Sequence, residues 1–305
     1  MENLIEQINE LKKEKNVVIL AHNYELPEVQ DIADFIGDSL GLARQAAKTD
    51  ADTILFCGVH FMAETASIIS PEKKVLIPDL NAGCSLADSL TAEELRKWKK
   101  ENPGAVVVSY VNTTAEVKAE TDYCCTSSNA VKVVQSIPED KLILFGPDQF
   151  LGKYVAEATG RNMKIWNGAC HVHKKVTDDM FDGMAEKYPD ADFLIHPECS
   201  CSAAAMHKSV NTSIVSTEGM IKKINSSDNK NFVVGTEIGI IHRLKKLRPD
   251  ANFIPIDNNV ICNHMKMITL EKVLDALKHD RYEVKVPQGL SEKAKLPIQR
   301  MLKIS

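Results

Sequence analysis

Short runs of β-branched and aliphatic residues alternate with amphipathic helical patterns along the chain. In the first third of the sequence, apolar runs at 16–21, 53–57 and 74–77 are separated by helical patterns such as 40–48 and 61–69. Strands that alternate with helices in this way are typical of a parallel sheet that helices cover on both faces. The pattern therefore predicts an α/β fold.

The same trio of strands occurs three times. The later trios lie at 105–110, 141–145 and 163–166, and then at 191–195, 231–234 and 252–256. Three landmarks recur with a spacing of roughly 90 residues, as expected for a triplicated supersecondary unit. A polar residue ends the first strand of each trio, a glycine ends the second, and a cysteine follows the third. The landmarks are His22, Tyr110 and His196; Gly58, Gly146 and Gly235; and Cys84, Cys170 and Cys262.

This repeat predicts three similar α/β modules with short parallel sheets, at residues 1–102, 103–188 and 189–305. The first module includes an N-terminal amphipathic helix, and the third includes a C-terminal tail. Ligands of open α/β sheets bind beyond the carboxyl ends of the strands, which is where the landmark residues lie. A pseudo-threefold arrangement of the modules would therefore bring the landmarks together around one central active site.

The composition limits the class of protein. A chain of 305 residues with 44% hydrophobic and 26% charged residues is ordinary for a globular protein. Its net charge is -5 and no basic stripe is present, so nucleic acid is not an expected partner. No apolar run approaches the roughly 18 residues of a membrane span, and the N-terminal segment is not a signal peptide. We therefore expect a cytoplasmic protein with no membrane partner.

Three of the eight cysteines form a candidate metal site. Because cytoplasmic thiols stay reduced, metal binding or catalysis is a better explanation for them than disulfides. Cys84, Cys170 and Cys262 each follow a strand, in loops that lack both the C-x2-C knuckle of structural zinc and the compact four-cysteine run of ferredoxins. Three thiolates fit an iron-sulfur cubane with one open iron, which would act as a Lewis acid. On the residues alone, zinc and buried free thiols stay open as alternatives.

The other cysteines and the nearby histidines receive structural interpretations. Burial is the expected role of Cys57, and packing between modules that of Cys124 and Cys125, while reversible oxidation of Cys199 and Cys201 is left open. A structural role is expected rather than ligation for the histidines beside the candidate ligands, which are His171, His173 and His264.

Hydroxyl side chains stand at the start of one helical pattern in each module. Ser39, Ser127 and Thr217 occupy these positions, where a hydroxyl and free backbone N-H groups can bind an anion. Each also suits an ordinary N-cap. If the three starts converge, they form a pocket suited to a small ligand that carries phosphate and carboxylates. The titratable groups able to move protons there are His22, Tyr24, His196 and Glu198.

Several segments together resemble the quinolinate synthase A family over nearly the whole chain. They are 19–24 (ILAHNY), 37–40 (GDSL), 83–88 (GCSLAD), 110–113 (YVNT), 125–130 (CTSSNA), 146–148 (GPD), 196–199 (HPEC) and 216–220 (STEGM). The resemblance implies an enzyme that condenses iminoaspartate with dihydroxyacetone phosphate to quinolinate, phosphate and two waters, in NAD biosynthesis. It also implies a [4Fe-4S] cluster with one open iron, and an aspartate-oxidising enzyme that supplies the iminoaspartate.

The resemblance also implies residue roles. The cluster ligands would be Cys84, Cys170 and Cys262, and proton transfer would fall mainly to Tyr24 and Glu198, with His22 and His196 beside them. The stretch before Thr217 looks longer than in short family members, so Ser213 is the alternative contact in the third module. The implied substrate contacts are His22, Ser39, Tyr110, Asn112, Ser127, His196, Glu198 and Thr217.

Two other functions remain compatible with the residues. One is a three-domain binding or carrier protein with structural zinc, which would be colourless. The other is a cluster-dependent hydro-lyase that acts on a hydroxy acid, since such an enzyme also needs an open iron.

Overall fold

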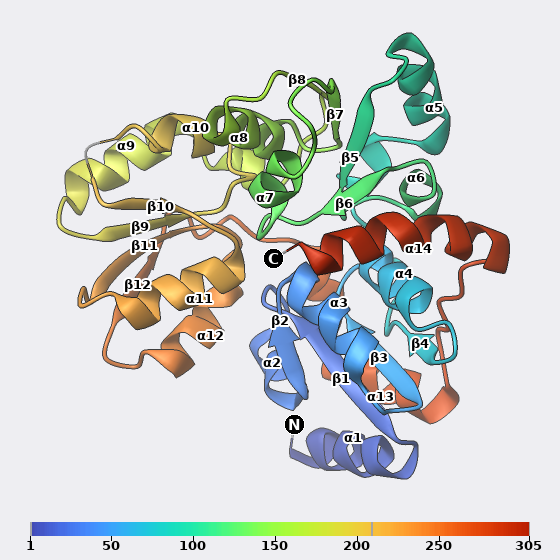
Figure 1. The fold of residues 1–305 in the computed structure, drawn as a ribbon. Helices are drawn as coiled ribbons and strands as arrows, with labels where there is room; N and C mark the ends of the chain where they lie inside the picture. Colours follow the sequence, from blue (N-terminus) through green and yellow to red (C-terminus); the bar gives the residue numbers. More distant parts are fainter. Residues whose placement is uncertain (1, 209, 305) are drawn as a thin grey trace.

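Three four-stranded sheets, each with all strands parallel, form the framework of the molecule (Figure 1). The computed structural model describes residues 2–208 and 210–304. The strand order is the same in each sheet: β2-β1-β3-β4, β6-β5-β7-β8 and β10-β9-β11-β12. The prediction of an α/β protein built from three similar modules is therefore confirmed.

The first module contains the N-terminal helix and the sheet β2-β1-β3-β4. Its strand β3 is buried at every position, which explains the continuous apolar run in the sequence. The elements are α1 (Glu2–Glu14), β1 (Val17–His22), α2 (Pro27–Ile32), β2 (Phe35–Gly37), α3 (Ser39–Lys48), β3 (Thr53–Cys57), α4 (His60–Ile69), β4 (Lys74–Leu76) and the 3-10 helix η1 (Ala87–Ser89).

The second module repeats this order of elements. Its first helix begins at a capping box in which Thr91 and Glu94 satisfy each other's backbone N-H groups. The elements are α5 (Ala92–Glu101), β5 (Val106–Tyr110), α6 (Ala115–Lys118), β6 (Tyr123–Cys125), α7 (Ala130–Gln135), β7 (Ile143–Gly146), α8 (Gln149–Thr159), β8 (Met163–Ile165) and η2 (His173–Lys175).

The third module repeats the order once more, and two further helices follow it. The elements of the module are α9 (Asp178–Lys187), β9 (Asp192–Ile195), α10 (Ser202–Ala205), β10 (Thr212–Ile214), α11 (Thr217–Ser226), β11 (Asn231–Gly235), α12 (Ile240–Leu247), β12 (Asn252–Pro255) and η3 (Met265–Met267). The last two helices are α13 (Leu270–His279) and α14 (Gln288–Lys303).

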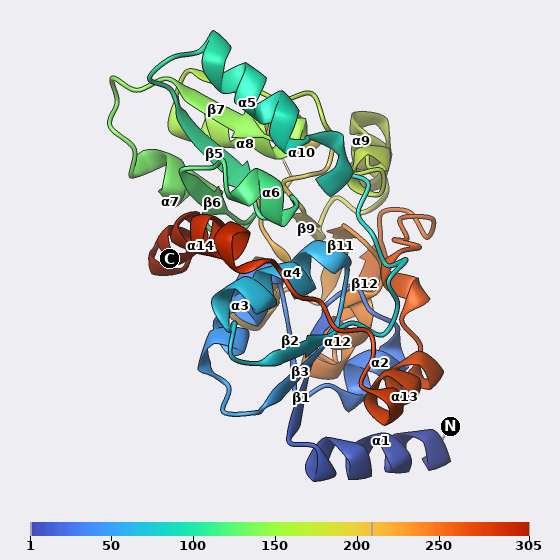
Figure 2. The same ribbon diagram turned by 90° about the vertical axis from the view of Figure 1, so that its right-hand side faces the viewer.

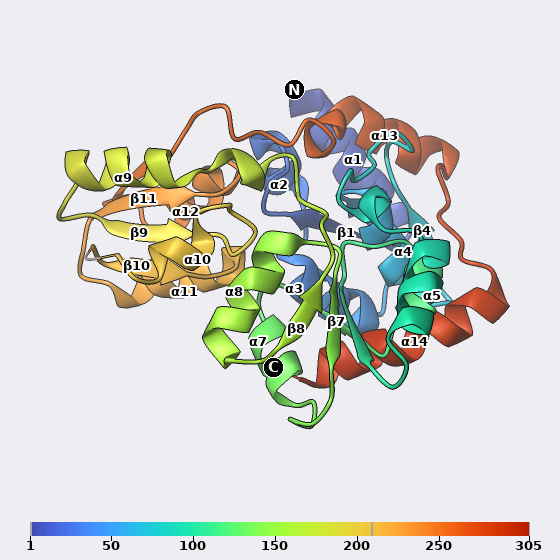
Figure 3. The ribbon, with the colours of Figure 1, turned by 90° about the horizontal axis from the view of Figure 1, so that it is seen from above.

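The helix that follows each cysteine loop packs on the sheet of the next module, and this closes a ring. Leu95 of α5 lies in a cluster with Val107 and Leu144 of the second sheet, and Phe181 of α9 contacts Phe193 of the third at 5.0 Å between ring centroids. After the third module, α13 packs against α1 and β3 of the first. The views from the side and from above show the three modules around a common centre (Figures 2 and 3). The predicted boundaries after residues 102 and 188 stay a prediction.

The C-terminal segment joins the first and second modules. Ile77 and Tyr282 exchange backbone hydrogen bonds of 2.9 and 3.1 Å, which adds an antiparallel bridge beside β4. Helix α14 then lies over α4, α6 and β6 (Figure 2). Its end is held where the amide of Asn129 donates to the carbonyl oxygens of Met301 (3.0 Å) and Ile304 (2.7 Å).

Each sheet has an edge strand that the hydrophobic pattern did not predict. These strands are β2, β6 and β10, and each has three residues and pairs only with the first strand of its module. Their position matters for function because Ser39, Ser127 and Thr217 follow them closely. Among the described residues, no helix is long and apolar enough to cross a membrane.

Candidate active site

The carboxyl ends of the three sheets face a central pocket of about 710 Å³, including the space open to solvent. Every residue that the sequence pointed to as a ligand, substrate contact or proton carrier lines this pocket. Ser213 instead lies in edge strand β10, half-buried and paired with Leu194. The lining residues predicted from sequence are His22, Tyr24, Ser39, Cys84, Tyr110, Asn112, Ser127, Cys170, His196, Glu198, Thr217 and Cys262.

The three cysteine loops have the same local structure. In each loop the amide N-H four residues after the cysteine donates to the cysteine carbonyl over 3.0 to 3.1 Å, and a 3-10 helix follows. This turn directs the second and third N-H groups after the cysteine at its own sulfur, in Cys84, Cys170 and Cys262 alike. Amide N-H groups aimed at a sulfur stabilise a thiolate, so each loop is built to hold one.

Burial is nevertheless the dominant influence on these thiols. It raises the pKa of Cys84 to about 12 and that of Cys262 to about 11, and it also raises the pKa of Cys170. The three sulfurs are close enough for Cys262 to raise the pKa of Cys84, and for Cys84 to raise that of Cys170. A metal centre would therefore displace the three protons when it binds.

Two carboxylates hold the cysteine loops of the second and third modules. Asp148 Oδ2 accepts a hydrogen bond from the backbone N-H of Cys170 at 3.1 Å, and Glu237 Oε1 accepts one from that of Cys262 at 3.2 Å. Asp148 stands two residues after Gly146, which ends β7, and Glu237 stands two residues after Gly235, which ends β11. His60 takes this position in the first module. This role of Asp148 and Glu237 was not predicted, although both residues lie at the same distance from a repeated glycine in the sequence.

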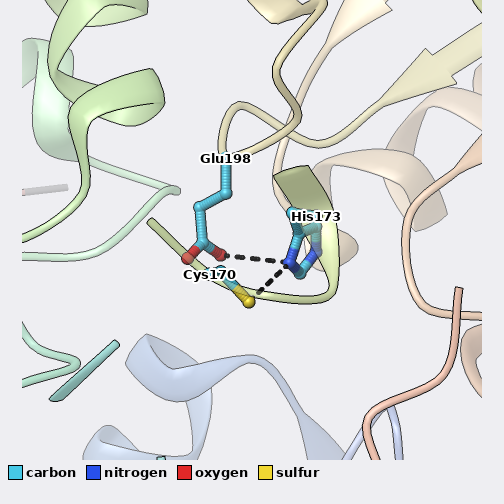
Figure 4. Close-up of side chains that lie close together, drawn as sticks. All are labelled: Cys170, His173 and Glu198. Atoms are coloured by element: carbon cyan, nitrogen blue, oxygen red, sulfur yellow. Dashed lines mark hydrogen bonds and ion pairs between the residues drawn. The ribbon is translucent and has the colours of Figure 1, made fainter. Parts of the chain in front are cut away.

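Glu198, His173 and Cys170 form the most compact group of potential ligands (Figure 4). The Nδ1 atom of His173 lies 3.3 Å from Cys170 Sγ and 3.8 Å from Glu198 Oε2. All three donor atoms lie within 4.8 Å of one another. His173 therefore connects a candidate ligand to the buried carboxylate, a contact that the sequence did not predict.

Residues of two modules surround the Glu198 carboxylate. Tyr110 donates a hydrogen bond to Oε2 at 3.1 Å, and His196 Nδ1 lies 3.3 Å from the same oxygen. Among the described residues, Oε1 is buried without a partner. Burial raises the pKa of Glu198 well above its usual range; the charge of nearby Asp148 adds to the rise, and the Tyr110 hydrogen bond opposes it. Burial therefore favours the protonated, uncharged form of the Glu198 carboxyl group.

The Tyr24 hydroxyl belongs to a second hydrogen-bonded group. It lies 2.6 Å from Thr236 Oγ1 and 3.2 Å from His173 Nε2, and Thr236 lies 3.0 Å from the same nitrogen. Burial raises the pKa of Tyr24. It has the opposite effect on the imidazoles and lowers the pKa of His22 and of His173 to about 3. The buried imidazoles are therefore neutral hydrogen-bonding groups.

The hydroxyls predicted at helix starts converge at the pocket, but they are not the caps. Asp38 caps α3 through Gly41 N (2.8 Å), and Ser216 caps α11 through Gly219 N (3.2 Å). The neighbouring Ser39 and Thr217 hydroxyls are therefore not required for capping. Both line the pocket together with Ser127 of the second module.

One serine connects the three modules beside these hydroxyls. Ser128 of the second module donates to Asp38 of the first, and its Oγ atom lies 3.0 Å from Ser216 Oγ of the third. Asn23 donates to Thr217 Oγ1 at 2.7 Å, and Arg243 donates to the side-chain oxygen Oδ1 of Asn23 at 2.6 Å. These contacts position the hydroxyl end of the pocket.

The remaining cysteines lie outside the pocket wall. Cys57, Cys124 and Cys125 are free and buried in the main core. Cys201 is free and buried in the separate hydrophobic cluster of the third module. The Cys199 thiol donates to the carbonyl of Gly235 at 3.2 Å.

Together, the fold and the pocket define a class of protein: an enzyme with three parallel α/β modules, in which three thiols face a buried carboxyl group and a phenol. The family model described as quinolinate synthetase A protein matches residues 6–303. The chain belongs to this family.

Proteins named quinolinate synthase are similar to this chain over almost its full length. The protein from Thermus thermophilus is 50% identical over 303 residues, which cover 99% of this chain and 98% of that protein. The protein from Pyrobaculum aerophilum is 50% identical over 306 residues, which cover 99% and 100% of the two chains. The protein from Mycobacterium tuberculosis is 49% identical over 306 residues, which cover 98% and 88%.

Proposed function

We propose that this protein is a quinolinate synthase, which condenses iminoaspartate with dihydroxyacetone phosphate to quinolinate, phosphate and two waters. Family membership supports the reaction, and the pocket supplies the groups that it needs. The observation that carries the proposal is the convergence of three equivalent cysteine loops on a pocket that also contains Glu198 and Tyr24.

The donor set fits a [4Fe-4S] cluster with one open iron. Cys84, Cys170 and Cys262 would be its ligands, because each loop aims two backbone N-H groups at its own sulfur. Soft thiolates with such N-H groups suit iron-sulfur centres. When bound, the cluster supplies a Lewis acid that stabilises negative charge on a substrate oxygen or nitrogen.

Neutral donors would bind the anionic groups of the substrates. Among the described lining residues there is no lysine or arginine, whereas hydroxyls of Ser39, Ser127 and Thr217 face the pocket from three modules. The side-chain oxygen of Asn112 is buried without a partner among the described residues, as expected for a group that a substrate donor completes. His22 adds a neutral imidazole to this wall.

Glu198 and Tyr24 would move the protons. Condensation and loss of two waters require protons to leave carbon and to reach departing oxygens. Glu198 can donate because burial raises its pKa, and Tyr110 and His196 fix the direction of its Oε2 atom. Tyr24 can exchange a proton within its group with Thr236 and His173.

The proposal extends to the supply of substrate. An imine such as iminoaspartate forms by oxidation of the amine of aspartate, so an aspartate-oxidising enzyme would be its source. We place both steps in the cytoplasm.

Anaerobic assay of quinolinate formation tests the proposal. Reconstituted protein should convert the two precursors to quinolinate and phosphate in equal amounts. Cys170→Ser should lose the cluster and the activity, whereas Cys57→Ala, which alters a buried core thiol, should retain both. A colourless, zinc-loaded protein that forms no quinolinate would overturn the proposal in favour of the binding-protein alternative.

A further inference from the structure

Lys118 is a fully buried cation that the site described above does not use. Its side chain has no exposed surface at the end of the four-residue helix α6. Lysine is almost never fully buried without a partner for its charge, because transfer of an ammonium group out of water is costly. Burial accordingly lowers the pKa of Lys118. The free-energy cost of burying Lys118 indicates that this side chain has a specific role.

The contacts of the ammonium group point to the turn between β5 and α6. Lys118 Nζ donates a hydrogen bond to the carbonyl oxygen of Thr113. The Thr113 hydroxyl donates to the carbonyl of Tyr110 at 3.1 Å. Thr113 is therefore bonded to the start of the turn through its hydroxyl and to Lys118 through its carbonyl. The ammonium also lies 5.4 Å from the ring centroid of Phe61, which lines the pocket.

A carboxylate from the first module supports the same turn. Glu64 Oε2 accepts a hydrogen bond from the backbone N-H of Ala115, the first residue of α6, at 3.1 Å. Glu64 is mostly buried, with 13% of its side chain exposed. Burial raises the pKa of Glu64 and lowers that of Lys118, and the attraction between the two groups opposes both shifts. The turn is thus hydrogen-bonded to Lys118 of its own module and to Glu64 of the first module.

This turn carries two groups of the proposed active site. Tyr110, where the turn starts, donates to Glu198, and Asn112 presents the unpartnered side-chain oxygen. A shift of the Thr113 carbonyl would move Asn112 directly, since the two residues are adjacent. Misplacement of a positioning group by about 1 Å can cost roughly 100-fold in rate.

We propose that Lys118 is a positioning residue of the active site, which fixes the turn at 110–115 so that Tyr110 and Asn112 meet the substrate. It acts through the Thr113 carbonyl and does not touch the substrate. The kinetic part of this inference rests on the proposed quinolinate synthase activity. The structural part concerns the turn itself and stands without it.

Hydrogen exchange and steady-state kinetics test the inference in the cluster-containing protein. Lys118→Met removes the charge and the donor at similar length, and Lys118→Gln retains a donor. Lys99→Met is the matched control, because Lys99 also donates to a backbone carbonyl, that of Glu120 at 2.7 Å, but 38% of its side chain is exposed on α5. Lys118→Met should speed amide exchange at 110–115 about 10-fold or more, leave β7 protected, and lower kcat/KM by about 10- to 100-fold with full iron content. Lys118→Gln should show smaller changes in both measurements, and the control should match the wild type.

Three results would overturn the inference. They are unchanged exchange at 110–115 in Lys118→Met, faster exchange everywhere in that variant, and equal kinetics in the wild type and the Met variant. If Lys118→Met does not fold, the double variant Lys118→Met with Glu64→Gln removes the unpaired carboxylate and takes its place in the same measurements. If the wild type forms no quinolinate, the proposed function fails, and exchange at 110–115 still decides the role of Lys118.

Discussion

Tyr110 donates a hydrogen bond to Glu198 over 3.1 Å, although Tyr110 ends a strand of the second sheet and Glu198 follows a strand of the third. The contact crosses the centre of the molecule, where the carboxyl ends of the three sheets meet. The contact shows that groups from different copies of the repeated module meet in the candidate active site.

Loss of this hydrogen bond should slow the reaction. In Tyr110→Phe the ring remains, but Glu198 Oε2 loses its donor. A hydrogen bond between neutral groups contributes about 0.5 to 1.5 kcal/mol, so turnover should fall roughly 2- to 10-fold. The measurement is kcat at full iron content. Turnover equal to that of the wild type would show that the Tyr110 hydroxyl is not used.

Glu198→Gln should separate substrate binding from proton transfer. Glutamine keeps the shape of the side chain and cannot exchange a proton, so the variant should assemble a normal cluster and still bind quinolinate. Its turnover should fall by roughly 100-fold or more, the size typical of a lost general acid or base. Tyr24→Phe should behave in the same way. Near-normal turnover in both variants would remove proton transfer by these residues from the mechanism.

The hydroxyls of Ser39 and Thr217 should affect substrate affinity more than folding. Because Asp38 and Ser216 cap the helices, Ser39→Ala and Thr217→Ala leave the caps in place. Loss of one neutral hydrogen bond of about 0.5 to 1.5 kcal/mol should raise KM roughly 2- to 10-fold. Ser213→Ala, in edge strand β10, is the control and should leave KM unchanged. The opposite result, an effect in Ser213→Ala alone, would make Ser213 the third-module contact.

The buried His22 should reduce stability at low pH. Burial first, and then nearby His173, Lys266 and Arg243, lower its pKa to about 3 from the usual 6.5. Because the folded-state pKa lies below the unfolded one, the unfolded chain binds the proton first as pH falls. The stabilisation is therefore complete above pH 6.5 and is lost progressively between pH 6.5 and about 3.

Urea unfolding of cluster-free protein at about pH 7.5 and about pH 5 measures this effect. The wild type should lose more stability between the two pH values than His22→Asn does. His207→Asn is the control, since His207 is exposed, and it should follow the wild type. An equal loss in wild type and His22→Asn would show that His22 is not held neutral.

Much of the fold could be predicted because long apolar runs such as Thr53–Cys57 carry a clear signal. The edge strands could not, since Phe35–Gly37 and Thr212–Ile214 have three residues each and are too short for any periodicity. They form because the first strand of each module offers a free edge. Tertiary pairing, rather than local preference, determines them.

The candidate site divides in the same way. Repeat spacing placed Cys84, Cys170 and Cys262 at equivalent loops, and the structure brings them to one pocket. The spacing could not show the partners of Tyr24, because Thr236 lies 212 residues away along the chain and His173 lies 149 away. The spacing also could not identify Lys118, because its proposed role depends on its burial beside the turn at 110–115.

The open iron is the central claim, and the electron-spin signal of the reduced cluster tests it most directly. Quinolinate that carries an isotopically labelled ring nitrogen is titrated into the anaerobically reconstituted, reduced protein, with unlabelled quinolinate as the control. We predict that quinolinate perturbs the signal, and that the hyperfine pattern changes with the nitrogen isotope, as expected if the ring nitrogen binds the iron that would lack a cysteine ligand. A signal that saturating quinolinate leaves unchanged would contradict the account.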